Sequence, residues 1–206
     1  MNSAPMTPGA GPSMFPTSPA AAMVQGALRF AVVSVGAFSV WAFAGRWFYR
    51  NVGELGLYVA TAMAFLALAA WLMPPLLAGR GRLRRFAGIF TAAFLAYAAA
   101  WCAAWFAWRD GAGEWLGSLA GSVVFAVIVC RALGRPQALW SCAAVLFATH
   151  SAGYFAGGKL YLWLGSQAAG GAGLGILAPL GWGLLYGLGF GAGMGFTFFA
   201  AQRRPG

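Results

Sequence analysis

The only histidine of the chain, His150, lies within a long apolar stretch. At 1.5 Å per helical residue it lies roughly 18 Å from the basic end of that stretch, near the middle of a bilayer. Tyr154 follows one helical turn later, Ser151 is the direct neighbour, and two further tyrosines fall at a similar depth in other apolar stretches. We therefore predict a polar patch at mid-membrane depth, with the candidate binding residues His150, Tyr154, Tyr97, Tyr186 and Ser151.

Three uses of this patch follow from the residue types. An ionisable side chain inside a membrane is by default a candidate functional site, here for binding or gating a solute. A neutral histidine that hydrogen-bonds to a tyrosine or serine of another helix has a purely structural role instead. A proton relay is the weakest of the three, because no Asp or Glu lies in any apolar stretch.

Enzymatic chemistry is not expected. Neighbouring helical residues point 100° apart, so His150 and Ser151 do not form a catalytic pair. The cysteines Cys102, Cys130 and Cys142 have no metal-ligand spacing, and a single histidine excludes a bis-histidine haem. We expect no metal and no cofactor.

The elements that position these residues follow from composition. The chain is 61% hydrophobic and 8% charged, whereas soluble domains carry about 25% charged residues. We predict an all-α integral membrane protein of six transmembrane helices with no soluble domain. The expected spans are near 28–48, 55–78, 86–108, 115–133, 138–163 and 176–201. Residues 1–24, rich in proline, are expected to form a flexible cytoplasmic tail without a cleavable signal, and residues 25–206 the transmembrane domain.

The basic residues predict the orientation. With both termini in the cytoplasm, nine of the thirteen basic residues lie on the cytoplasmic side, as the positive-inside rule requires. These nine are Arg29, Arg80, Arg82, Arg84, Arg85, Arg131, Arg135, Arg203 and Arg204. We read the segment "GRGRLRR" (79–85) as a topology signal that contacts anionic lipid, not as a nucleic-acid site. The expected location is the plasma membrane.

Small residues recur at helical spacing in two segments. Gly183, Gly187, Gly191 and Gly195 form a row like a glycine zipper, with Gly189 and Gly193 expected beside it, and an aromatic row runs one position earlier. The segment 86–108 has a comparable alanine row, Ala92, Ala96, Ala100 and Ala104. Such rows let helix backbones approach closely in lipid. We expect these two helices to face each other, and the third, fifth and sixth helices to form the centre; the alternative is a homo-oligomer contact.

Two function classes remain. The first is a membrane protein that binds or transports a small, neutral or weakly basic solute through the polar patch. The second is a structural or assembly subunit that docks through its Gly/Ala rows, on a second copy or in a larger membrane complex. Most tryptophans near the outer ends are expected in an interfacial belt; these are Trp47, Trp105, Trp108, Trp115, Trp163 and Trp182. Trp101 lies deeper, where it and Tyr97 could contribute to an aromatic cage for a cation.

Overall fold

The computed structural model describes residues 15–167 and 172–203, and this part of the chain is helical without strands. The helices are α1 (Pro19–Ser39), α2 (Gly45–Asn51), α3 (Glu54–Leu72), α4 (Arg82–Trp108), α5 (Gly111–Ala132), α6 (Leu139–Gln167) and α7 (Ala172–Gln202). A π-helical turn, Val40–Ala44, joins α1 to α2, and short 3-10 turns occur at Pro74–Leu76 and Pro136–Ala138.

Five helices of the described chain are long and apolar enough to cross a membrane. They are Pro19–Asn51, Glu54–Leu72, Arg82–Trp108, Gly111–Ala132 and Gly173–Gln202. Helix α6 has sufficient length but is less apolar, since it contains His150 and Lys159. The molecule is therefore an all-helical protein of the membrane-embedded type.

The first helix begins earlier than its expected start near residue 28. Ser18 caps it by accepting a hydrogen bond from the Ala21 amide at 3.1 Å, and Pro19 occupies the first helical turn. Residues 19–24 are thus helical and do not belong to a tail, while residues 1–14 lie outside the described part. Helix α3 ends at Leu72, just before the Pro74-Pro75 pair, because proline cannot continue the helical hydrogen bonds.

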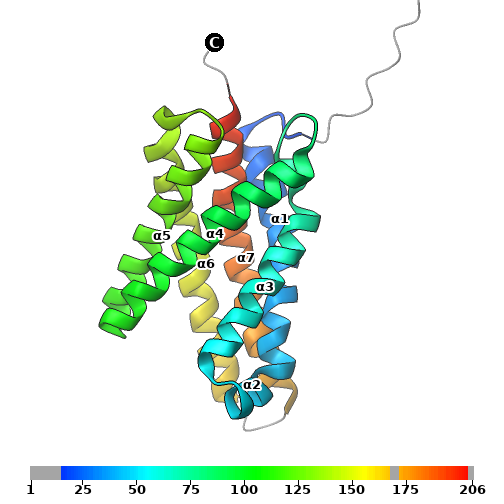
Figure 1. Cartoon of the computed structure of the whole chain (residues 1–206). Coiled ribbons are helices and arrows are strands. Elements are labelled where there is room, and N and C mark those ends of the chain that lie inside the picture. Colours follow the sequence, from blue (N-terminus) through cyan, green and yellow to red (C-terminus); the bar gives the residue numbers. More distant parts are fainter. Residues whose placement is uncertain (1–14, 168–171, 204–206) are drawn as a thin grey trace, which may run out of the picture.

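The long helices are arranged in a ring. Each packs mainly on two neighbours, in the order α1, α7, α6, α5, α4, α3 and back to α1. Both ends of the described chain lie at one end of the bundle, and α2 lies at the other (Figure 1). Helix α4 crosses the bundle obliquely, so its C-terminal half diverges from α3 towards the α2 end (Figure 1).

The expected pairing of the α7 glycine row with the α4 alanine row is wrong. A Cβ at Gly191 would overlap the Gly26 carbonyl oxygen, and one at Gly187 would lie 2.7 Å from the Ala31 Cα, so this row packs on α1. A Cβ at Gly189 or Gly193 would instead meet the backbone of α6. Residues two positions apart point about 200° apart around a helix. The row through Gly187 and Gly191 and the pair Gly189 and Gly193 therefore lie on two different faces of α7. Helix α7 therefore lies closely between α1 and α6, and α4 contacts it only through long side chains, such as the Phe86 and Phe198 rings with centroids 5.1 Å apart.

Helix α4 packs on α5 through a glycine row that the sequence analysis did not identify. Gly113, Gly117 and Gly121 recur every fourth residue, and each faces α4. A Cβ at Gly117 would lie 3.1 Å from the Trp101 carbonyl oxygen, and one at Gly121 would lie 2.5 Å from the Tyr97 ring. The close approach of α5 therefore holds the aromatic side chains of α4 in place.

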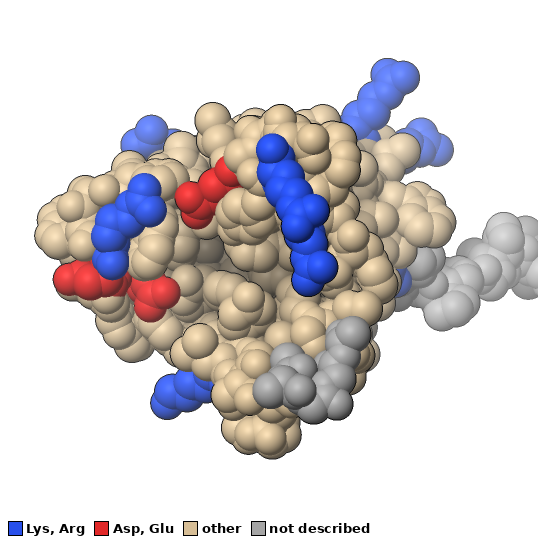
Figure 2. Space-filling view, turned by 90° about the horizontal axis from the view of Figure 1, so that it is seen from below, with Lys and Arg blue, Asp and Glu red and all other residues tan. Residues whose placement is uncertain are grey.

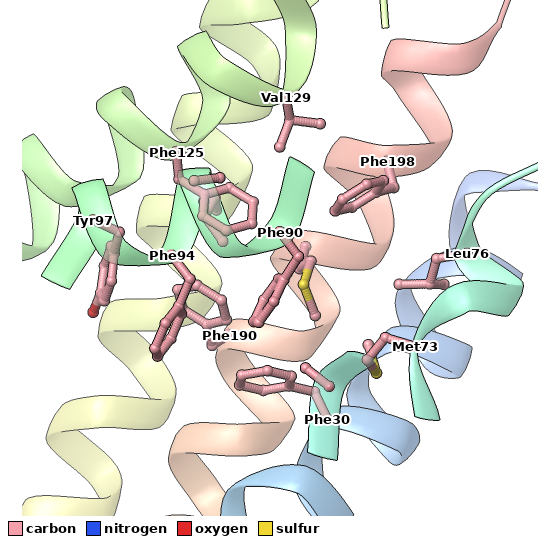
Figure 3. Close-up of a cluster of buried hydrophobic side chains, with 14 of the residues drawn as sticks. Phe30, Met73, Leu76, Phe90, Phe94, Tyr97, Phe125, Val129, Phe190 and Phe198 are labelled. Carbon is pink, nitrogen blue, oxygen red and sulfur yellow. The ribbon is translucent and has the colours of Figure 1, made fainter. Parts of the chain in front are cut away.

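Phenylalanine rings fill the interior of the ring of helices. Figure 3 shows Phe30, Phe90, Phe94, Phe125 and Phe190 directed towards a common centre from α1, α4, α5 and α7. Phe190 lies at its middle, with centroids 5.2 Å from Phe30 and 5.5 Å from Phe125. This half of the bundle is filled by apolar side chains, and the less completely filled space lies towards the α2 end.

Candidate functional site

A pocket of about 200 Å³ opens where α4 diverges from α3. Ten of its fourteen lining residues are aromatic, and none is Lys, Arg or His. The lining is Phe38, Trp41, Tyr58, Thr61, Ala62, Phe65, Phe94, Tyr97, Ala98, Trp101, Cys102, Tyr154, Trp182 and Tyr186. A cavity of roughly 150 Å³ holds a benzene molecule, so this volume suits a small ligand.

The π-helical turn helps to form the wall. It places Trp41 at the pocket, where the indole packs 5.7 Å from the Tyr58 ring and 6.4 Å from the Phe38 ring. Single π turns inside α-helices are rare and frequently occur at functional sites. The end of α1 and the π turn that follows it therefore form one wall of the pocket, through Phe38 and Trp41.

His150 lies behind the pocket wall. Its side chain is fully buried, and its Nε2 is 2.7 Å from the Tyr97 hydroxyl. The rings of Tyr154, Tyr186 and Phe190 surround it at centroid distances between 5.5 and 5.8 Å. The arrangement fixes Tyr97, which lines the pocket, by a hydrogen bond from α6 to α4. The Nδ1 atom of His150 is buried without a partner.

Two tyrosines of the wall hydrogen-bond to carboxylates outside it. Tyr154 donates to Glu114 Oε1 at 3.1 Å, and Tyr58 donates to Glu54 Oε1 at 3.0 Å. Figure 2, a view onto the α2 end, shows acidic side chains on two parts of this face with a hollow between them. The same face also carries basic side chains (Figure 2), and Lys159 lines a neighbouring pocket together with Glu114, Tyr154 and Trp182.

The structure brings together four of the five predicted site residues. Tyr97, Tyr154 and Tyr186 line the pocket, and His150 contacts the rings of all three. Ser151 points elsewhere: it is buried and lines a different surface pocket, with Trp115 and Phe155 among others. The 100° step between adjacent helical residues separates it from His150.

Several lining residues were not predicted as site residues. Trp182 was assigned to the interfacial belt, but it lines the pocket and packs 5.6 Å from the Tyr154 ring. Its place in the aromatic row before Gly183 was the available signal, because that row faces the interior. Trp41 and Tyr58 had no such signal, since their positions depend on the π turn and on the packing of α3.

The chemistry of the pocket is that of binding. Within the described part of the chain, no group of three or more His, Cys, Asp or Glu side chains could hold a metal ion. Cys102 contributes a single thiol, and the rest of the lining offers aromatic faces and hydroxyls. Such a surface attracts apolar bodies and, through the negative faces of its rings, cations.

Comparison of the chain with known proteins gives no match, either to a family model, to a curated protein or to a solved structure.

Proposed function

We propose that the protein crosses the membrane six times, with both ends in the cytoplasm, and that it binds or transports a small, neutral or weakly basic apolar solute in the aromatic pocket. The observation that carries the proposal is this mainly aromatic pocket, which lies next to an interior filled by apolar side chains. Three tyrosines that contact His150, namely Tyr97, Tyr154 and Tyr186, contribute hydroxyl groups to the pocket.

Six crossings agree with the arrangement of the ends. Both described ends lie together, and the three acidic residues all belong to the opposite end. Helix α6 packs between α5 and α7 along the bundle, and its polar side chain at mid-length, His150, is buried inside the protein. The plasma membrane is the location that we propose for this topology.

A weakly basic solute is favoured over an acidic one by the electrostatics of the pocket. Aromatic faces carry a negative quadrupole, and the hydroxyls of Tyr58 and Tyr154 donate to carboxylates. Hydrogen-bonded groups polarise one another in a low-dielectric environment, which makes these rings better partners for a cation. An anion would find no basic side chain in the lining, and Lys159, at the neighbouring pocket, lies there together with Glu114.

The alternative of a structural subunit has less support. It relied on small-residue rows as docking surfaces, and the α7 rows, like a glycine zipper, already contact α1 and α6 of the same chain. The α4 alanine row retains exposure at Ala92, while Ala104 is buried against α5. A homo-oligomer or a larger complex would have to use another surface.

Binding can be tested with a pair of probes that differ in charge alone. Benzyltrimethylammonium and its neutral isostere neopentylbenzene have the same shape, and three pocket tryptophans allow detection by fluorescence quenching. We expect saturable quenching of the full-length protein in mild detergent, with the cation bound at least about threefold more tightly. Ala98→Phe, which fills the pocket from α4, controls for partition into the micelle. Quenching that persists in this variant would contradict the pocket as the binding site.

Transport is distinguished from binding by flux. Proteoliposomes that contain the full-length protein should take up benzyltrimethylammonium faster than proteoliposomes that contain Ala98→Phe. Native mass spectrometry of the same preparations measures the oligomeric state. A stable assembly with a dry pocket and no bound probe would support the structural alternative.

A further inference from the structure

A second pocket lies at the end of the bundle where the chain begins and ends. It has a volume of about 370 Å³ and is bordered by the start of α1, the turn before α6 and the last turn of α7. Its polar and charged side chains are Arg135, Arg203, Gln137 and Ser141. This pocket is separate from the aromatic pocket, with which it shares no lining residue.

Arg135 has an unsatisfied guanidinium group in this pocket. Its Nη1 atom is buried and has no hydrogen-bond partner within the described structure. The main chain of Arg135 is fixed, because its amide donates to the Cys130 carbonyl oxygen at 2.8 Å. A buried, charged donor without a partner costs free energy, and such a group is commonly satisfied by a bound ion or water. The residue therefore points to an external partner.

No Asp or Glu side chain is placed to be that partner. The three acidic residues are Glu54 at the start of α3 and Asp110 and Glu114 at the start of α5, all at the opposite end of the bundle. The end that holds Arg135 instead collects further arginines, among them Arg203 and Arg131. The acidic side chains of the protein therefore supply no counter-charge at this end.

The surroundings favour an anion over a solvent-filled surface hollow. Two helix starts border the pocket, at Pro19 and just before Leu139, and helix N-termini carry partial positive charge. Arg203 is held over the Phe199 ring, with its guanidinium carbon 4.9 Å from the centroid. Ser141 and Gln137 add neutral hydrogen-bonding groups. A guanidinium group presents several N–H donors in a fixed plane, which suits an oxyanion with several acceptor oxygens.

We propose that this pocket binds a phosphate-type oxyanion, with Arg135 and Arg203 as its charged partners. The same chemistry is offered by the headgroup of an anionic phospholipid and by free inorganic phosphate. The site does not depend on what the aromatic pocket binds, and the test below does not use that pocket.

Thermal unfolding of the delipidated full-length protein in mild detergent tests the proposal. The probes are phosphatidylglycerol, phosphatidylcholine as a zwitterionic control, and inorganic phosphate against chloride at equal ionic strength. At ten times its dissociation constant, a bound probe should raise the Tm by about 3–6 °C. Native mass spectrometry should show one retained adduct per chain. Stabilisation by phosphatidylglycerol alone identifies the lipid headgroup as the ligand, and equal stabilisation by phosphate identifies the free anion.

Arg135→Gln is the decisive variant, and Arg131→Gln is its matched control. Both remove one positive charge from the same end, but Arg131 is exposed and does not line the pocket. Arg135→Gln should lose at least two thirds of the Tm shift, whereas Arg131→Gln should keep it. If Arg135→Gln fails to fold, Arg203→Gln tests the same site. Equal shifts in the variants and the control, or no shift with either anion, would overturn the proposal.

Discussion

Replacement of Gly191 by alanine tests how closely α7 packs on α1. The added methyl group would overlap the Gly26 carbonyl oxygen and lie 2.7 Å from the Phe30 Cβ. Backbone cannot rotate away as a side chain can, so α1 and α7 must move apart. Gly175→Ala is the matched control on the same helix, because nothing lies within 4 Å of a Cβ at that position.

The expected magnitude follows from two opposing terms. Overpacking of a close contact costs about 1–3 kcal/mol. Alanine in place of glycine returns up to about 1 kcal/mol through helix propensity. The net loss for Gly191→Ala should be about 0–2 kcal/mol; relative to Gly175→Ala, where the propensity gain cancels, the loss should be about 1–3 kcal/mol, or about 2–12 °C in Tm for a chain of this length. Gly175→Ala gains only the propensity term and should unfold at the same or a slightly higher temperature.

The assay is thermal unfolding of both variants in one mild detergent, followed by intrinsic fluorescence. The difference in Tm between Gly191→Ala and Gly175→Ala is the measured quantity, so general effects of detergent cancel. Tm values that agree within 1 °C would refute the close contact between α1 and α7 and, with it, the order of helices around the ring.

Three further predictions concern topology and the pocket wall. In intact cells, single cysteines introduced at 79–85 should react only with reagents that reach the cytoplasm, and those at 109–114 only with outside reagents; outside labelling of 79–85 would contradict the orientation. His150→Phe should lower the stability by about 1–3 kcal/mol in thermal melts, because the Tyr97 hydroxyl then loses its buried partner; an unchanged Tm would exclude that role. The same variant should weaken benzyltrimethylammonium binding if His150 positions Tyr97, whereas unchanged affinity in the folded variant would limit His150 to packing. Gly121→Ala should displace the Tyr97 ring, since the new Cβ would lie 2.5 Å from it, and should weaken binding of the same probe in the quenching assay; unaltered binding would show that Tyr97 is not a fixed wall.

The local properties of the chain were available from the sequence. The apolar stretches predict the helices because hydropathy and length are properties of each segment alone. The Pro74-Pro75 pair predicts the end of α3, since proline interrupts the backbone hydrogen bonds of a helix. The sequence also shows that Glu54, Asp110 and Glu114 lie at the ends of apolar stretches, which places them at one end of the bundle once the helices alternate in direction. The start of α1 was misplaced because a proline-rich composition obscured the cap at Ser18.

The partners of each helix were decided by the tertiary structure. Two helices with small-residue rows can each accept several neighbours, so the sequence could not show that α7 contacts α1 and α6 while α4 contacts α5. Depth along the helices did place Tyr97, Tyr154, Tyr186 and His150 at one level, because that depth depends only on residue spacing. Whether they enclose a pocket depends on the oblique path of α4 and on the π turn at Trp41. These features result from the fit of side chains distant in sequence, and no segment contains that information by itself.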